Sequence, residues 1–218
     1  MKKLLLLLFL ILLFSEVSFL KAERVNSIRN WINWNTSSIP DIPVRKGIAG
    51  TFAGVHNNVL IIAGGSYFDK PIWENGKKIY LDSIFVCVKT GEKYQWRFVG
   101  QLPFPVAHGS AISVDNGLLC IGGQNHDQKS KKVFLLHWDE DRQIVTIDED
   151  FPDLPEACSY VSASAINNTV YVIGGKKQDG AVETESNEFW KLDIVSGSVS
   201  EWQPLEPCPG GARFRSEE

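Results

Sequence analysis

Three pairs of adjacent glycines in this chain each come directly after a short apolar run. The pairs are Gly64–Gly65, Gly122–Gly123 and Gly174–Gly175, and successive copies lie 58 and 52 residues apart. A repeat of about this period is typical of a β-propeller, in which each copy forms one four-stranded blade. The sequence therefore predicts an all-β fold built from about three four-stranded blades.

Each copy contains the same order of segments. A proline-rich turn precedes a strand of small residues, and a tight turn with asparagine or glycine, which tolerate positive φ, leads into the apolar strand. A variable loop follows the glycine pair, and a third and a fourth strand complete the copy. The expected first strands cover residues 50–54, 109–113 and 162–166, the second 59–63, 117–121 and 169–173, and the third 82–87, 132–136 and 188–192, with Trp96, Ile144 and Trp202 in the fourth. Small side chains suit an innermost strand, where blades converge on the axis.

Two further segments resemble parts of a copy. Residues 31–35 resemble an orphan outer strand, and residues 209–215 resemble the start of a fourth copy. Three copies are too few to close a ring. We therefore expect a half ring that exposes a sheet face and a strand edge at each end, which is an aggregation hazard.

The first residue, Met1, is followed by two lysines and an apolar run from Leu4 to Phe14. This order is typical of a secretory signal peptide, with a cleavage position at Ala22. The alternative is an uncleaved anchor, although the run is short for a span of about 20 residues. We expect a signal peptide over residues 1–22 and a partial propeller over residues 23–218. The protein would then be exported, periplasmic or secreted, with no stable membrane insertion after signal cleavage.

Composition limits the partners and the cofactors. The net charge is −4 and no basic block is present, which argues against nucleic acid as a partner. The four cysteines, Cys87, Cys120, Cys158 and Cys208, are widely spaced and have no metal-ligand pattern, so we expect neither a metal nor a cofactor. Export would permit disulfides, but Cys87 and Cys120 lie in apolar runs, where buried free thiols are expected.

The strand order predicts which loops share one face. The first and second strands of a copy run antiparallel, so the loop before the first and the loop after the second lie at the same face, here called the mouth. The mouth is predicted to carry Arg45, Lys46, His108, Tyr160 and Arg213 from the entry loops, and Trp73, Glu74, Lys77, Lys78, Tyr80, Asn125, His126 and Asp127 from the loops after the glycines. Ligands commonly bind at loops that a rigid scaffold holds in place.

A glycine pair followed by aromatic residues and tryptophan is the kelch pattern, and this resemblance covers roughly residues 34–215. A narrower match is carried by the segments GIAGTFAGV (47–55), LIIAGG (60–65), WENGKKIY (73–80), PVAHG (105–109) and GLLCIGG (117–123). Here the chain resembles the sialic acid mutarotase (N-acetylneuraminate epimerase) family. These segments come early in the chain, so it resembles the cyclically permuted branch of that family.

The resemblance implies a six-bladed ring, of which this chain holds about three blades, and an exported enzyme that interconverts the α and β anomers of N-acetylneuraminate during sialic acid uptake. Ring opening needs a base and an acid, and a cation would hold the sugar carboxylate. The family's proposed catalytic glutamate follows a glycine pair in a blade that this chain does not reach. Here Ser66, Gln124 and Lys176 follow the pairs. We therefore assign no catalytic residue and expect this fragment to be inactive.

The candidate substrate-binding residues are Arg45, Glu74, Lys77, Tyr80, His108 and Arg213. For the charged loop residues the alternative is an ordinary solvated loop, and for His108 it is a structural histidine. Arg213 would suit a carboxylate. The run Asn125 to Asp127 resembles loose metal ligands, but without a second cluster a polar loop is expected.

Two functions from different classes therefore stay open. The first is a sugar-anomer isomerase, or the remnant of one, that acts on sialic acid. The second is a non-catalytic kelch binding module for glycan or protein. The sequence does not predict the oligomeric state.

Overall fold

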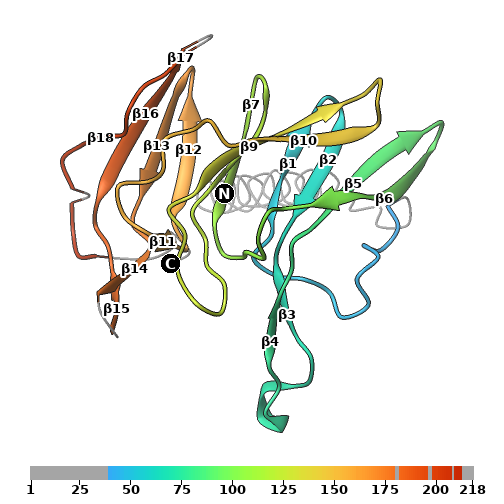
Figure 1. Cartoon of the computed structure of the whole chain (residues 1–218), viewed down its shortest axis with the longest axis horizontal. Coiled ribbons are helices and arrows are strands. Elements are labelled where there is room, and N and C mark those ends of the chain that lie inside the picture. Colours follow the sequence, from blue (N-terminus) through green and yellow to red (C-terminus); the bar gives the residue numbers. More distant parts are fainter. Residues whose placement is uncertain (1–38, 180–181, 196–197, 208, 213–218) are drawn as a thin grey trace, which may run out of the picture. The chain divides into compact units, whose positions relative to one another are not determined.

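The computed structural model describes residues 39–179, 182–195, 198–207 and 209–212 (Figure 1). The expected signal peptide and the expected outer strand at residues 31–35 lie outside the described residues, as does Arg213. Within the described ranges, no helix is long and apolar enough to cross a membrane.

Three antiparallel sheets follow one another along the chain (Figure 1). The first sheet contains, in spatial order, β1 (Phe52–His56), β2 (Val59–Ala63), β5 (Ser83–Thr90) and β6 (Lys93–Gln101). The second contains β7 (Ser110–Val114), β8 (Gly117–Ile121), β9 (Val133–Asp139) and β10 (Ile144–Asp148). The third contains β12 (Ser162–Ile166), β13 (Thr169–Ile173) and β16 (Phe189–Val195), with the short strands β17 (Ser198–Val199) and β18 (Gln203–Pro204) both paired to β16. The predicted four-stranded blades are therefore confirmed.

The fourth strand of the third blade differs from the prediction. Trp202 was expected inside this strand, but it lies in the interval between β17 and β18. Its indole N–H donates to the Pro152 carbonyl at 2.9 Å, as the Trp96 indole in β6 donates to the Pro40 carbonyl at 2.8 Å. In both blades the tryptophan thus ties the outer part of the sheet to the proline-rich turn that enters the same blade.

The first strands lie along the inner edge, where neighbouring sheets approach each other. β1 lies beside β7, and β7 lies beside β12. On β1, a Cβ atom added to Gly54 would lie 2.2 Å from Leu118 Cδ1, so a larger residue would require the buried Leu118 side chain to shift. The Val55 N–H donates to Ser113 Oγ at 3.0 Å across the same gap. The prediction that small residues mark the innermost strands is confirmed.

The glycine pairs join consecutive blades. Gly64 and Gly122 have φ values of 64° and 65°, in the left-handed region that glycine favours. The next glycine donates to a carbonyl in the entry segment of the following blade: Gly65 to Val106 and Gly123 to Cys158, both at 2.8 Å. The pair therefore turns the chain out of the second strand and bonds one blade to the next.

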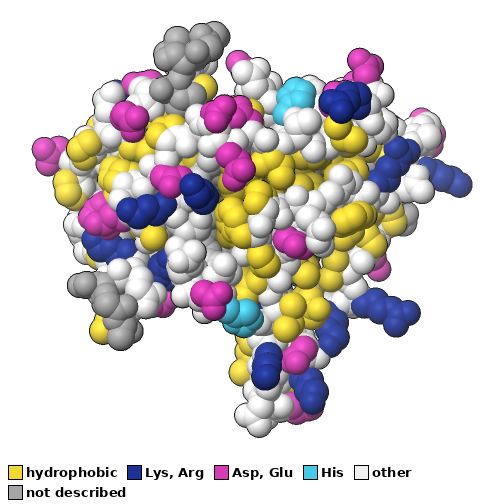
Figure 2. All heavy atoms as spheres, viewed as in Figure 1, with side chains coloured by type: hydrophobic (Ala, Val, Ile, Leu, Met, Phe, Trp, Pro, Cys, Tyr) yellow, Lys and Arg dark blue, Asp and Glu magenta, His cyan; other side chains and the backbone are white. Residues whose placement is uncertain are grey.

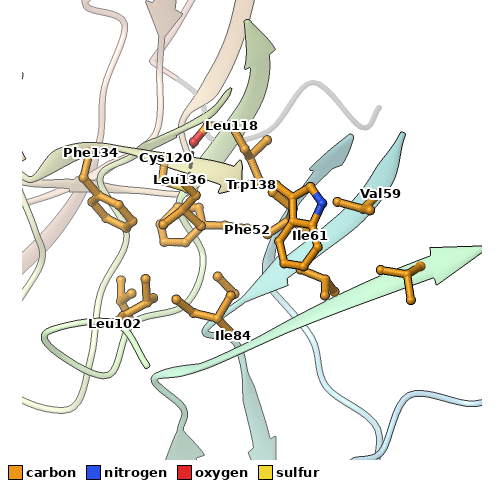
Figure 3. Close-up of a cluster of buried hydrophobic side chains, with 14 residues drawn as sticks. Phe52, Val59, Ile61, Ile84, Leu102, Leu118, Cys120, Phe134, Leu136 and Trp138 are labelled. Carbon is orange, nitrogen blue, oxygen red and sulfur yellow. Dashed lines mark hydrogen bonds between the residues drawn. The ribbon is translucent and has the colours of Figure 1, made fainter. Parts of the chain in front are cut away.

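Apolar side chains fill the space between the sheets in two layers, the first of which is drawn in Figure 3. In the first layer, the Phe52 and Phe134 rings meet edge to face with centroids 5.5 Å apart, and Trp138 packs beside them. β8 is buried along its whole length because Leu118 faces the first sheet while Leu119 faces the third. The middle blade is thus covered on both faces, and the apolar area buried there stabilises the fold.

The first and third sheets each have a less covered face. Along β2, buried side chains alternate with half-buried ones, because alternate residues point to opposite faces of a sheet. Val55 and Phe98 on the first sheet are 55% and 59% exposed, and Ile166 on the third is 62% exposed. These faces of the first and third sheets therefore carry exposed apolar side chains.

Three of the four cysteines are free and buried in the described part of the chain. Burial raises the pKa of the Cys120 thiol well above its usual range. It also raises the pKa of Cys158 to about 11, with smaller contributions from Glu156 and Glu188. The expectation of buried free thiols is confirmed for Cys87 and Cys120, and Cys208 lies outside the described residues.

Two loops after the glycine pairs contain strands that the sequence did not predict. The first forms a hairpin of β3 (Ser66–Phe68) and β4 (Lys78–Tyr80), which projects from the blades in Figure 1. The third forms a small sheet of β11 (Cys158–Ser159), β14 (Lys176–Asp179) and β15 (Val182–Glu185). The sequence did not reveal these strands because, at two to four residues each, they are too short to show the apolar alternation that marks a strand in sequence.

Candidate functional site at the mouth

One residue at the entry of each blade has a left-handed backbone. These residues are Gly50, His108 and Tyr160, with φ values of 66°, 63° and 55°. The His108 N–H donates to the Gly50 carbonyl at 2.7 Å, and the Tyr160 N–H donates to the His108 carbonyl at 2.6 Å. The three entry loops are thereby joined edge to edge. The rings of His108 and Tyr160 stack with centroids 4.6 Å apart.

The side chain of His108 lies buried at the centre of this arrangement, with 7% of its surface exposed. A Cβ atom on Gly50 would lie 2.4 Å from its Nδ1, so the glycine leaves the space that the ring occupies. His108 Nε2 is 3.2 Å from Lys78 Nζ and 3.3 Å from Ser66 Oγ. An ammonium has only donors, so Nε2 accepts from Lys78 and the ring proton is on Nδ1.

Tyr80 lies beside His108 and Lys78. Lys78 and Tyr80 are two residues apart on β4, so both side chains point to the same side of the hairpin. The Tyr80 ring meets the rings of His108 and His126 edge to face, with centroids 6.4 and 5.0 Å apart. Gln124 Nε2 donates to Tyr80 Oη at 3.1 Å. Ser66, Lys78, Tyr80, His108, Gln124 and His126 are called the mouth cluster below.

The positive charge of Lys78 has no carboxylate partner among the described residues. Ion pairs there involve Lys129, Lys132, Lys176, Lys177 and Lys191 instead. Lys78 Nζ lies over the Phe68 ring at 5.6 Å and the Tyr80 ring at 5.8 Å. An ammonium beside a phenol and two imidazoles can form charge-assisted hydrogen bonds to an anionic ligand.

The structure brings together only some of the predicted site residues. His108 and Tyr80 belong to the mouth cluster. Glu74 and Lys77 are exposed in the outer part of the β3–β4 hairpin, where the Lys77 N–H donates to Asp69 Oδ1 at 2.6 Å. Ser66 pairs with Tyr80 at the base of the hairpin, so Lys77 lies about 10 Å further out along the strand. Figure 2 shows basic and acidic side chains along this projecting hairpin.

The other predicted residues do not join the cluster. Arg45 is exposed in the entry loop of the first blade, and no contact of the described residues links it to the mouth cluster. Arg213 lies outside the described residues. Asn125 Oδ1 accepts from the N–H groups of Asp127 and Gln128 at 2.9 and 3.0 Å, so this run is a polar turn. Within the described ranges, no group of three or more potential metal ligands is present.

Sequence reasoning missed the roles of Ser66, Lys78 and Gln124. Ser66 and Gln124 were noted only as residues that follow a glycine pair and are not glutamate. Each pairs with the entry segment of its own blade: Ser66 with Ala49, and Gln124 with Ala107. The residue after a glycine pair therefore always returns to the mouth, and this position was the available signal.

Comparison with known proteins identifies the family. The model of the N-acetylneuraminate epimerase family matches residues 18–145, and the kelch motif model matches residues 157–209. The chain belongs to the N-acetylneuraminate epimerase family. The whole mouth cluster lies inside the segment that the epimerase model matches.

Individual relatives match only parts of this chain. The N-acetylneuraminate epimerase of Vibrio vulnificus is 37% identical over 103 residues, covering 42% of this chain and 26% of the relative. N-acetylneuraminate epimerase 1 of Escherichia coli O6:H1 is 27% identical over 150 residues, covering 59% of this chain and 39% of the relative. The solved structure of YjhT covers 81% of this chain and 56% of its own, with a TM-score of 0.56 and 12% identity, which supports the propeller fold alone.

Proposed function

We propose that the mouth cluster binds the carboxylate of a sialic acid and contributes to a mutarotase-like function in sialic acid uptake by an exported protein. The observation that supports this proposal is the Lys78 ammonium, which has no carboxylate partner among the described residues and lies beside Tyr80 and His108. N-acetylneuraminate is an anion whose carboxylate accepts charge-assisted hydrogen bonds. The relatives named N-acetylneuraminate epimerase support the same ligand class.

We propose further that the described residues bind the sugar without supplying the catalytic base. Mutarotation needs a group that accepts the anomeric proton, and a base works best with a pKa near the working pH. Glu183 is the carboxylate nearest in the hydrogen-bond network, and the hydrogen bond from Lys129 lowers its pKa. Nε2 of His108 is already engaged by Lys78 and Ser66. We therefore expect this chain alone not to accelerate anomer exchange.

A non-catalytic binding module for glycan or protein is the second candidate. It is favoured by the tip of the β3–β4 hairpin, where Trp73 and Ile72 are 85% and 65% exposed. Backbone hydrogen bonds from Glu74 and Gly76 to the Pro71 carbonyl fold this tip. A partner that binds there would not need the mouth cluster.

Binding and exchange can be measured in one experiment. The purified chain is titrated with N-acetylneuraminate while proton exchange spectroscopy follows the two anomers. We expect saturable binding and exchange at the buffer rate. Absence of binding would refute the proposal that the mouth cluster binds the sugar. Accelerated exchange would refute the proposal that the described residues supply no catalytic base.

Lys78 in β4 and the preceding residue, Lys77, provide a matched pair of variants. Lys78→Met removes the ammonium of the mouth cluster, and Lys77→Met removes an exposed ammonium one residue away. Loss of a charge-assisted hydrogen bond should weaken N-acetylneuraminate binding about tenfold in Lys78→Met. Lys77→Met should bind as the unmodified chain does. Equal binding by the two variants would exclude Lys78 as the carboxylate ligand.

A further inference from the structure

A chain of hydrogen bonds crosses the mouth from the third blade to the first, and it starts at a buried lysine. The Lys129 side chain is 3% exposed. Its ammonium contacts Glu183 Oε1 at 2.6 Å, Ser159 Oγ at 3.0 Å and Gln124 Oε1 at 3.3 Å. An ammonium has three protons, so these three oxygens accept all of them.

Lys129 determines which way the Gln124 amide points. The ammonium can only donate, so the atom of Gln124 that faces it must be Oε1. The Nε2 group then faces Tyr80 Oη at 3.1 Å. The backbone of Gln124 is fixed as well, since its N–H and C=O both bond to Ala107, at 2.8 and 2.9 Å. The amide therefore has one orientation that satisfies both neighbours.

The orientation of Gln124 in turn decides the role of Tyr80. An amide NH₂ can only donate, so the phenolic oxygen of Tyr80 accepts this hydrogen bond. Among the contacts of the described residues, no group accepts a hydrogen bond from the phenolic O–H of Tyr80. That proton is available on the side of β4 where the Lys78 ammonium also lies.

We infer that Lys129 and Gln124 are positioning residues that make Tyr80 a hydrogen-bond donor to the ligand held by Lys78. Tyr80 and Lys78 together then present two donors, which suits a ligand group that only accepts, such as a carboxylate. A cationic or amide N–H group of a ligand would instead face two donors, Tyr80 and Lys78, and could not form a hydrogen bond to either of them. The choice of N-acetylneuraminate as ligand rests on the proposed function, whereas the orientation of Tyr80 rests on the hydrogen bonds alone.

The burial of Lys129 agrees with this role. An ammonium loses its hydration on burial, and an apolar residue would fill the same space without that loss. Lys129 joins loops of two blades, because Ser159 is in β11 and Glu183 is in β15 while Gln124 belongs to the second blade. Its bonds thus fix the mouth cluster against the third blade.

The variant Gln124→Glu tests the inference with little change in shape. An ionised glutamate can still accept from Lys129, but it accepts from Tyr80 as well, so the phenolic O–H donates to the glutamate and no longer to the ligand. N-acetylneuraminate should bind about tenfold more weakly. Gln128→Glu is the matched control, because Gln128 is an exposed residue of the same loop. This control adds the same charge and should change binding less than twofold.

A ligand-free measurement separates the two proposals. The Tyr80 ring is labelled with ¹³C at Cζ, and its chemical shift is compared between the unmodified chain and the two variants. Gln124→Glu should move this signal toward the phenolate value, and Gln128→Glu should leave it in place. An unmoved signal in Gln124→Glu would overturn the inference even if the sugar binds. Absence of sugar binding by the unmodified chain would refute the proposed function, while the signal still tests the orientation.

A second variant covers the case in which Gln124→Glu does not fold. Tyr80→Phe keeps the ring that packs against His108 and removes only the phenolic oxygen. Its affinity for N-acetylneuraminate should fall about tenfold, as for a lost hydrogen bond to a charged group. Unchanged affinity in a folded Tyr80→Phe chain would show that Tyr80 donates nothing to the ligand, and would overturn the inference.

Discussion

The joint between the second and third blades should be very sensitive to a single methyl group at Gly122. An alanine there would keep a left-handed backbone, which destabilises an L-residue by about 1 kcal/mol. Its Cβ would also lie 2.6 Å from the Cys158 carbonyl oxygen. Cys158 is fully buried and paired in β11, so the carbonyl has little room to move. Displacing it would break the bond from Gly123, which adds roughly 2 kcal/mol for a buried group left unpaired.

Gly122→Ala should therefore lower the free energy of unfolding by about 3 kcal/mol. Gly91 provides the control, because its φ is 62° and a Cβ there would meet no atom within 4 Å. Gly91→Ala should lower the unfolding free energy by about 1 kcal/mol, from the backbone alone. Urea unfolding followed by tryptophan fluorescence measures both. Equal losses in the two variants would refute the steric account of the glycine pair.

Other perturbations have equally direct readouts. Burial and the neighbouring His137 lower the pKa of His56, so the unfolded chain binds this proton first and stability falls as the pH drops below about 6.5. His56→Gln should flatten urea midpoints between pH 7 and 5, and an unchanged slope would contradict this. Cys120 and Cys158 should react with a thiol reagent at pH 8 only as fast as the chain unfolds, because burial raises both pKa values. Trp73→Ala should change the unfolding free energy by less than about 0.5 kcal/mol, since this side chain is exposed; a larger loss would reveal a packed tip.

The blades could be predicted because their strands must be apolar on the faces that meet. The run at 117–121 is apolar throughout, and β8 is covered by sheets on both sides. The turns could be predicted from residues such as Asn57 and Asn167, whose φ values are 46° and 53°. β14 and β15 could not, because the residues Lys176–Asp179 and Val182–Glu185 carry mostly polar side chains. Their pairing is set by the third blade around them and not by their own periodicity.

The candidate site was only partly predictable for a related reason. The antiparallel order of strands placed Tyr80 and His108 at one mouth, but it could not tell how far the loop between Ser66 and Tyr80 projects. That loop folds as a hairpin, which takes Glu74 and Lys77 outward, whereas the Lys78 side chain lies beside His108. The spacing of residues along the sequence does not tell which of the two adjacent lysines contacts His108.

The three entry residues share one backbone conformation but differ in their side chains. The same left-handed backbone occurs at Gly50, His108 and Tyr160, and glycine adopts it without strain. A histidine or tyrosine there is strained by about 1 kcal/mol, so its side chain must offset that strain. For His108 the offset is visible in the stacking on Tyr160 and in the bonds from Lys78 and Ser66. The glycine pairs thus fix where the blades meet, and the side chains at the entry positions, His108 and Tyr160, stack on each other at the mouth.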